Sequence, residues 1–277
     1  MPLSRRELCI AGLGVPVASI ATYLLARRGV ETSQASAGYR SSLVDGYTPK
    51  RVDWDGYRWS ADMGSTWIAG MEHSFQPGQD RARFEIQPTP RDRAAGDAPD
   101  KRRSELHCTR NRLPNGVPLW GAMSFIHHSW SDPEGMAKGW GGVHGQIHMG
   151  KFGGSPALAF RRTRDGRFLV TTRGQFDDGN NRRWMAPVSF DEAHDLVYRV
   201  ILHPSSGELD VWLDGKHVFE LRGASIGSQV GGSYWCLGCY YSGGISCPVV
   251  AEFANHAFPS TEDLSTRASA PLEWPIA

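Results

Sequence analysis

The sequence predicts an all-β protein, a β-sandwich of the jelly-roll kind whose curved sheet forms a groove for a ligand. Composition is the first indication, because 32 Gly, 17 Pro, 10 Trp, 8 Tyr and 11 Phe among 277 residues are typical of many short strands joined by tight turns. Dipeptides that favour turns also separate short alternating runs through residues 39–258. After residue 37, no run keeps the helical period of apolar residues for three turns.

The charge balance excludes one large class of partners. The net charge is +1, with 30 basic and 29 acidic residues, and no block of five like charges occurs. Proteins that bind DNA or RNA usually carry a basic surface that releases counterions from the phosphates. We therefore expect no nucleic-acid partner.

The first 37 residues read as an export signal. Arg5 and Arg6 precede an uncharged stretch from residue 8 to residue 26, and Ala35-Ser36-Ala37 offers a cleavage site. This pattern predicts a twin-arginine-type signal peptide over residues 1–37, one domain over 38–277, a periplasmic or secreted location and no stable membrane partner after cleavage. The alternative is an uncleaved membrane anchor, which the glycines and proline inside the stretch disfavour.

Four cysteines remain after cleavage: Cys108, Cys236, Cys239 and Cys247. The predicted compartment permits disulfides, and four cysteines allow three pairings that the sequence leaves open. Cys236 and Cys239 have the spacing of a zinc or redox pair. However, they lie in a strand-like run where positions i and i+3 face opposite ways, so no metal site is predicted there.

Turn signals place the strands in order along the chain. They stand at residues 115–116, 165–166, 178–179, 206–207 and 214–215, as Asn-Gly, Asp-Gly or Ser-Gly. The clearest hairpin spans residues 208–219, where Leu209, Val211 and Leu213 alternate with polar or aromatic residues before Asp214-Gly215. Residues 91–101 read as a polar loop and residues 260–277 as an irregular tail.

Two strand-like motifs carry polar residues at alternate positions. In residues 102–107, Arg103, Glu105 and His107 fall on one face of a strand. In residues 144–148, the same period places His144, Gln146 and His148 together. Each motif alone also fits a purely structural role, either as a solvated edge strand or as a strand with buried histidines.

A third motif, residues 234–241, is aromatic. Tyr234, Cys236, Gly238 and Tyr240 fall on one face, and the missing side chain of Gly238 is expected to leave room for a ligand beside the Tyr240 hydroxyl. The other face reads as core, and as an isolated strand the whole run fits core packing.

Together and in this order, the three motifs resemble jelly-roll, concanavalin-like polysaccharide lyases. Alginate lyases of this type carry R-[ST]-E-L, Q-[IV]-H and Y-F-K-A-G-x-Y strands, matched here by residues 103–106, 146–148 and 234–240. The flanking segments 83–86, 154–158 and 211–215 look closer to the glucuronan lyase and heparin lyase I group. This chain departs from the pattern at Cys236, where the family usually has lysine, and at Cys239.

The resemblance implies cleavage of a uronic-acid-containing, anionic polysaccharide by β-elimination. Arg103 and Gln146 would neutralise the uronate carboxylate so that the C5 proton becomes acidic. Tyr240 would serve as base and acid on a D-uronate, whereas an L-uronate needs His148 as base and Tyr240 as acid. Tyrosine is a weak acid, so Tyr240 needs a positive neighbour, for which Arg103 or protonated His148 is expected.

Further residues are expected to support this site. Glu105 is assigned to substrate binding and to orienting Arg103, while His144 and Tyr234 are assigned to substrate binding. Replacing Arg103 by alanine is expected to reduce turnover by about 10²–10³ with little change in stability. No cofactor is required, although calcium, known in the heparin and glucuronan lyases, has a possible acidic turn in Asp177, Asp178 and Asn180.

Two other classes remain as alternatives. A non-catalytic carbohydrate-binding module or lectin would share the fold, the groove and the aromatic residues. A glycoside hydrolase needs paired carboxylates; Glu208 and Asp210 partly match such a strand, but position 212 is Trp. A zinc site drawn from His127, His128, His144 and His148 is not supported, because adjacent strand histidines diverge.

Overall fold

The computed structural model describes residues 51–54, 57–61, 73–78, 80–90, 92, 97–108, 112–136, 141–150, 155–175 and 181–275. It confirms the all-β prediction. The strands are β1 (Arg51–Trp54), β2 (Tyr57–Ala61), β3 (Phe75–Pro77), β4 (Arg81–Ile86), β5 (Arg102–His107), β6 (Pro118–His127), β7 (Gly142–His148), β8 (Leu158–Arg162), β9 (Arg167–Thr172), β10 (Asn181–Pro187), β11 (Ala193–Ile201), β12 (His203–Leu213), β13 (Lys216–Ile226), β14 (Tyr234–Tyr241) and β15 (Val249–Ser260). Two short helices, α2 (Pro133–Met136) and α3 (Ser265–Ser269), complete the described elements.

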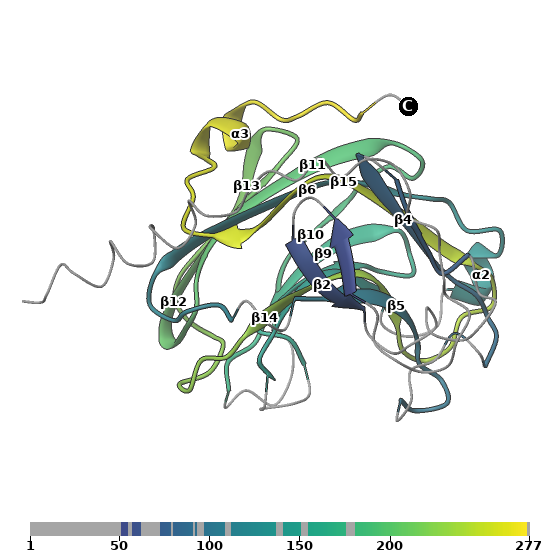
Figure 1. The fold of residues 1–277 in the computed structure, drawn as a ribbon, viewed down its shortest axis with the longest axis horizontal. Coiled ribbons are helices and arrows are strands. Elements are labelled where there is room, and N and C mark those ends of the chain that lie inside the picture. Colours follow the sequence, from purple (N-terminus) through teal and green to yellow (C-terminus); the bar gives the residue numbers. More distant parts are fainter. Residues whose placement is uncertain are drawn as a thin grey trace, which may run out of the picture. The chain divides into compact units, whose positions relative to one another are not determined.

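Two antiparallel sheets form the sandwich (Figure 1). One has eight strands in the order β1-β2-β5-β14-β7-β8-β9-β10, and the other has seven in the order β13-β12-β11-β6-β15-β4-β3. Strands distant in sequence therefore lie side by side, as in a jelly roll. In particular, β14 pairs with β5 on one side and with β7 on the other, which brings all three sequence motifs together.

The core lies between the sheets and follows from the two-residue period of the strands. On β14, Trp235, Leu237 and Tyr241 belong to this core and are at most 1% exposed. They face side chains of the opposite sheet, such as Tyr198, whose ring centroid lies 5.7 Å from that of Trp235. The intervening residues of β14 must therefore point to the outer side of the eight-stranded sheet.

The predicted turns are confirmed in part. Asp214 and Gly215 have φ values of 51° and 75° and close the hairpin between β12 and β13, as a two-residue turn with both central residues at positive φ requires. Gly166, with φ 83°, turns the chain between β8 and β9. The turn predicted at residues 206–207 is wrong, because β12 continues through it with a register irregularity. The turn predicted at 178–179 lies outside the described residues.

The end of the chain is more regular than predicted. Residues 265–269 form α3, and the Arg267 guanidinium binds the buried Asp195 carboxylate with an Nη2–Oδ1 distance of 2.6 Å. This ion pair ties the segment to β11. The predicted signal peptide, residues 1–37, and its boundary lie outside the described residues. Within the part of the chain that is described, no helix is long and apolar enough to span a membrane.

The four cysteines at 108, 236, 239 and 247 are all buried and form no disulfide. None of the three pairings that the sequence left open is therefore present. Cys239 points into the core, where its Sγ lies 3.9 Å from the Phe84 carbonyl oxygen, and burial raises the pKa of its thiol well above the ordinary value. Such a thiol is a poor nucleophile and a poor metal ligand.

Candidate functional site

The three motifs meet on one face of the eight-stranded sheet. In the register, Cys236 of β14 lies between His107 of β5 and Gln146 of β7, while Tyr240 pairs with Arg103 and Tyr234 with His148. Directly paired residues point to the same side of a sheet. We call the outer side of this sheet, which carries Arg103, Glu105, His107, Tyr234, Tyr240, Gln146 and His148, the motif face.

Glu105 is the hub of the motif face. Its carboxylate accepts a hydrogen bond from the Gln146 amide at 2.6 Å and one from Arg103 Nη1 at 3.1 Å, and His107 Nε2 lies 3.6 Å away. Burial by itself raises the pKa of the Glu105 carboxyl, but the neighbouring His107 side chain and the charge of Arg103 outweigh it and hold the pKa below its ordinary value. Glu105 is therefore an ionised carboxylate, although it is only 2% exposed.

This burial changes the role expected for Glu105. Its carboxylate contacts Arg103, as the predicted orienting role requires. Its burial disfavours the predicted role in substrate binding, because the carboxylate is covered and its oxygens are engaged by neighbouring side chains. Glu105 instead holds the Arg103, His107 and Gln146 side chains in one cluster.

Arg103 is clamped on two sides. Its Nε and Nη2 donate to the two carboxylate oxygens of Asp97 at 2.8 and 2.9 Å, which is a bidentate ion pair. The Arg103 guanidinium carbon also lies 4.5 Å from the centroid of the Tyr240 ring. The arginine is therefore a rigid neighbour of Tyr240, and both Asp97 and Glu105 compensate its charge.

Aromatic and basic groups surround Tyr234 at the other end of the motif face. The ring centroids of His148 and His107 lie 5.1 and 5.7 Å from that of Tyr234. The Arg112 guanidinium covers the same ring at 5.1 Å and donates a hydrogen bond to the Gly232 carbonyl at 2.9 Å. Along β7, Gln146 lies between His148, the partner of Tyr234, and Val143, the partner of Tyr240. The polar side chains of the motif face, from Tyr234 at one end to Tyr240 at the other, therefore form a continuous strip, which we call the polar strip.

His144 is not part of this strip, and its assignment to substrate binding is wrong. It is 2% exposed and lies between the sheets, where its ring centroid is 4.1 Å from that of His127. The reason is a register irregularity: β7 has an extra residue between Val143 and Gly145 relative to β8. Residues 144 and 145 consequently both face the core, which a strict two-residue alternation does not predict.

Gly238 also has a different role from the one expected. Its φ is 144°, and a Cβ atom there would lie 2.1 Å from the Ser104 carbonyl oxygen and 2.9 Å from the Glu105 Cα. The missing side chain therefore allows close approach of the β5 backbone and does not open space beside the Tyr240 hydroxyl. Cys236, where the resembled family has lysine, is fully buried beneath the polar strip.

Sequence reasoning missed three residues of this region. Asp97 lies in the polar loop before β5, Arg112 lies before β6, and Arg161 lies on β8 beside the motif strands. The adjacent pair Arg161-Arg162 is visible in the sequence. However, only the register of β8 shows which arginine faces the core and which faces outward.

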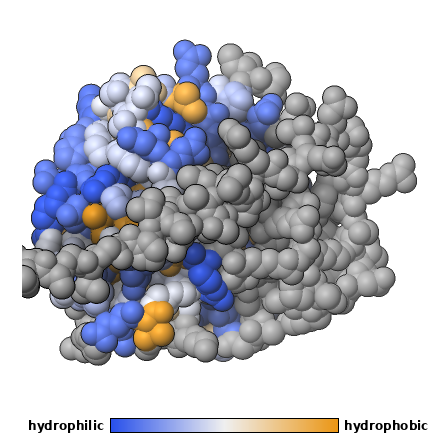
Figure 2. Space-filling view, turned by 60° about the vertical axis from the view of Figure 1, so that its left-hand side comes forward, coloured by the Kyte–Doolittle hydropathy of each residue, from blue (hydrophilic) through white to orange (hydrophobic). Residues whose placement is uncertain are grey.

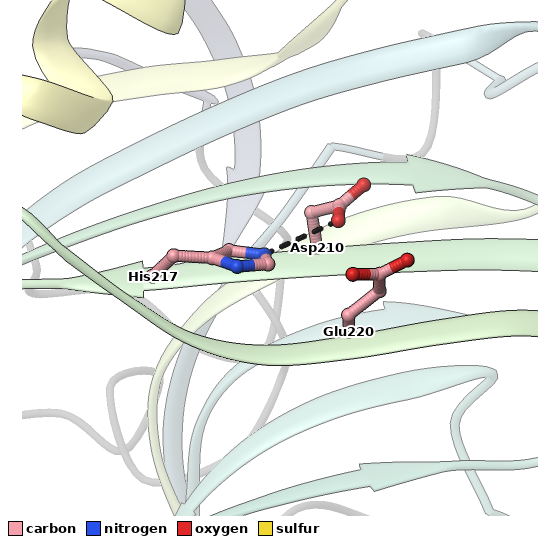
Figure 3. Close-up of side chains that lie close together, drawn as sticks. All are labelled: Asp210, His217 and Glu220. Atoms are coloured by element: carbon pink, nitrogen blue, oxygen red, sulfur yellow. Dashed lines mark hydrogen bonds and ion pairs between the residues drawn. The ribbon is translucent and has the colours of Figure 1, made fainter.

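One group of side chains in the described part has the spacing of a metal site: Asp210, His217 and Glu220 on β12 and β13, in the seven-stranded sheet (Figure 3). Asp210 is already engaged by Arg222, whose Nη2 lies 2.8 and 2.9 Å from its two carboxylate oxygens. His217 Nε2 lies 3.3 Å from Asp210 as well. The group is thus an ion-pair network, and it lies on the other sheet from the motif face. The possible calcium turn, residues 177, 178 and 180, lies outside the described residues.

The described surface is mainly polar where it can be seen. Among the coloured residues of Figure 2, hydrophilic ones dominate and hydrophobic ones stand singly or in small groups. Among the described large hydrophobic residues, Val230 and Leu272 are exposed, at 74% and 49%.

The fold and the motif face together define a jelly-roll sandwich with a polar strip on one sheet. The endo-β-1,4-glucuronan lyase of the fungus Trichoderma reesei has a similar structure, with a TM-score of 0.50 and 14% identity over 76% of this chain and 90% of that one. A GH131 β-glucanase catalytic domain from Podospora anserina is similar with a TM-score of 0.50 and 11% identity over 76% of this chain and 88% of that one. For an alginate lyase from Klebsiella pneumoniae, the TM-score is 0.48 and the identity 13% over 66% of this chain and 82% of that one.

The likenesses to the glucuronan lyase and the β-glucanase, each with a TM-score of 0.50, establish the fold. No protein-family model matches the sequence, and no curated protein matches it either. Because the same fold carries a lyase and a glucanase, the fold does not choose between their chemistries. That choice depends on the side chains of the motif face.

Proposed function

We propose that this protein is a polysaccharide lyase that cleaves a uronic-acid-containing polymer by β-elimination. The observation that carries the proposal is the composition of the motif face. It joins a tyrosine stacked on an arginine to an amide and a histidine on three adjacent strands. Similarity to the glucuronan lyase supports the proposal at the level of the fold.

The electrostatics of the site disfavour a hydrolase. A glycoside hydrolase needs two carboxyl groups flanking the substrate, one of them protonated with a raised pKa. On the motif face, the Glu105 pKa is lowered and both Glu105 and Asp97 are ion-paired with Arg103. Asp210, the hydrolase candidate, is bound by Arg222 on the other sheet. The described carboxylates near the motif therefore serve to position other groups.

β-Elimination uses the remaining groups directly. The base removes the C5 proton, the electron pair passes into the neighbouring carboxylate, and the C4–O4 bond breaks as O4 gains a proton. Tyr240 is the proposed base and acid on a D-uronate, and His148 is the base on an L-uronate. Gln146, held in place by Glu105, is the amide donor that faces the sugar. Arg103 fixes the Tyr240 ring.

The test is the ultraviolet absorbance of the unsaturated uronate that elimination forms. The protein would be incubated with glucuronan, alginate, heparin, heparan sulfate and hyaluronan in separate assays. Tyr240→Phe is expected to lower turnover by about 10²–10⁴, with a loss of stability of no more than about 1.5 kcal/mol. Tyr241→Phe is the matched control: it removes the neighbouring hydroxyl on the core side and should leave turnover nearly unchanged.

Two outcomes would contradict the proposal. Binding of a polymer without any unsaturated product would favour the lectin alternative. A Tyr240→Phe enzyme with more than about a tenth of normal turnover would show that the proton passes through another group. We also propose export by the twin-arginine pathway, which would fail if replacing both Arg5 and Arg6 by lysine left secretion unchanged.

A further inference from the structure

The motif face needs a second cation if it is to bind a uronate carboxylate. Arg103 donates through Nε and Nη2 to Asp97 and through Nη1 to Glu105. The Asp97 and Glu105 carboxylates compensate the charge of this guanidinium, so it offers little attraction to an anionic sugar. Arg103 thus has the right position beside Tyr240, but its donors are already used within the protein.

Arg161 lies on the same face, one strand beyond Tyr240's partner on β7. Tyr240 pairs with Val143, and Val143 pairs with Arg161. Arg161 also pairs with Leu169 of β9. The residues that precede these two, Phe160 on β8 and Phe168 on β9, point into the core, so Arg161 points outward. Two strand spacings separate Arg161 from Tyr240, roughly 10 Å between backbones, and an arginine side chain can span most of that gap.

The surroundings of Arg161 leave its charge uncompensated. Its Nε donates to the Thr171 hydroxyl at 3.0 Å, and the described part of the protein offers its two terminal nitrogens neither a carboxylate nor another hydrogen bond. Burial lowers the pKa of its guanidinium to about 10, and an ionised Tyr240 would act in the opposite direction. Arg161 is therefore a partly dehydrated cation at neutral pH.

We propose that Arg161 binds the carboxylate of the uronate whose C5 proton Tyr240 removes. Both terminal nitrogens can engage one carboxylate in a planar, bidentate pair. As the C5–H bond breaks, the proton passes to the base and the electron pair adds charge to the carboxylate held by Arg161. This inference rests on the proposed function and names the charge of the substrate that the site selects.

The experiment measures binding separately from catalysis. In a Tyr240→Phe background, calorimetry would compare a uronate polymer with the same polymer after reduction of its carboxyl groups. The parent variant is expected to prefer the charged polymer by about ten- to a hundredfold, as loss of a charge-assisted hydrogen bond predicts. Adding Arg161→Gln should remove this preference, and adding Arg161→Lys should restore part of it.

Arg183→Gln is the matched control, because Arg183 Nε also donates to a threonine, Thr172, but from the edge strand β10. It should keep the preference. If the Arg161→Gln variant is folded by circular dichroism and still prefers the charged polymer, Arg161 does not bind the carboxylate. This conclusion holds whether or not the protein is a lyase. If no unsaturated product forms on any polymer but Arg161 still governs the preference, the lyase proposal fails and the carboxylate site stands.

Discussion

At the scale of single residues, one buried carboxylate organises the site. Glu105 is nearly inaccessible, yet its pKa is held below the ordinary value by His107, Arg103 and Gln146 despite the opposing effect of burial. Desolvating a carboxylate costs several kcal/mol unless its partners compensate. The orientation of the motif face is therefore coupled to the stability of the domain, in contrast with the expectation that Arg103 contributes to turnover alone.

Arg103→Ala should reveal this coupling. It leaves Glu105 buried without its guanidinium partner, so the free energy of unfolding is expected to fall by about 3 kcal/mol. Adding Glu105→Gln removes the uncompensated charge, and the double variant should be more stable than Arg103→Ala. Urea unfolding of the four proteins in this cycle measures the coupling. Strictly additive effects would show that the two side chains do not interact.

At the scale of elements, β14 decides the arrangement, because it lies between β5 and β7. The irregularity of β7 at residue 144 determines which of its side chains reach the motif face, whereas β14 keeps a strict alternation from Tyr234 to Tyr241. Bulges of this kind turn side chains out of a strict alternation. The bulge in β7 places His144 in the core.

Gly238→Ala tests the irregularity in β14. The new Cβ would meet the Ser104 carbonyl oxygen at 2.1 Å, and φ 144° strains any residue with a side chain. Unfolding free energy is expected to fall by about 3 kcal/mol or more. Gly232→Ala is the control, because its φ is 79° with no atom within 4 Å, so it should cost about 1 kcal/mol. Equal losses in chemical denaturation would argue against a close approach of β5.

At the scale of the whole molecule, the space between the sheets contains neutral histidines. Burial, aided by the charge of Arg162, lowers the pKa of His144 to about 3 and that of His127 well below the ordinary range. Burial likewise lowers the pKa of His256 to about 3. The His256 Nε2 accepts a hydrogen bond from Trp235 Nε1 at 3.0 Å, which requires a neutral ring.

These histidines predict acid sensitivity with a definite sign. Below pH 6.5 the unfolded chain gains protons that the folded protein does not, so stability falls as the pH drops from about 6.5 towards 3. At pH 5, His256 is expected to account for a loss of about 2 kcal/mol in the free energy of unfolding. His256→Gln keeps an acceptor for Trp235 and does not titrate.

Urea unfolding of the wild type and His256→Gln at pH 7 and pH 5 checks this. The difference at pH 7 measures the loss of packing, and the wild type should lose about 2 kcal/mol more than the variant on going to pH 5. An identical loss in both proteins would show that His256 is not held neutral by the fold.

The sequence by itself determined the all-β class, the main hairpins and the three motifs, because two-residue periodicity and turn dipeptides are local properties. It also placed Arg103, Gln146 with His148, and Tyr234 with Tyr240 on single faces of three separate strands, whose pairing came from the structure. Only the tertiary structure showed that Asp97 clamps Arg103, that Glu105 is buried, that His144 faces the core, and that Arg161 presents its charge beside the motif strands. Strand pairing and bulges decide these points, since they depend on residues far apart in the chain.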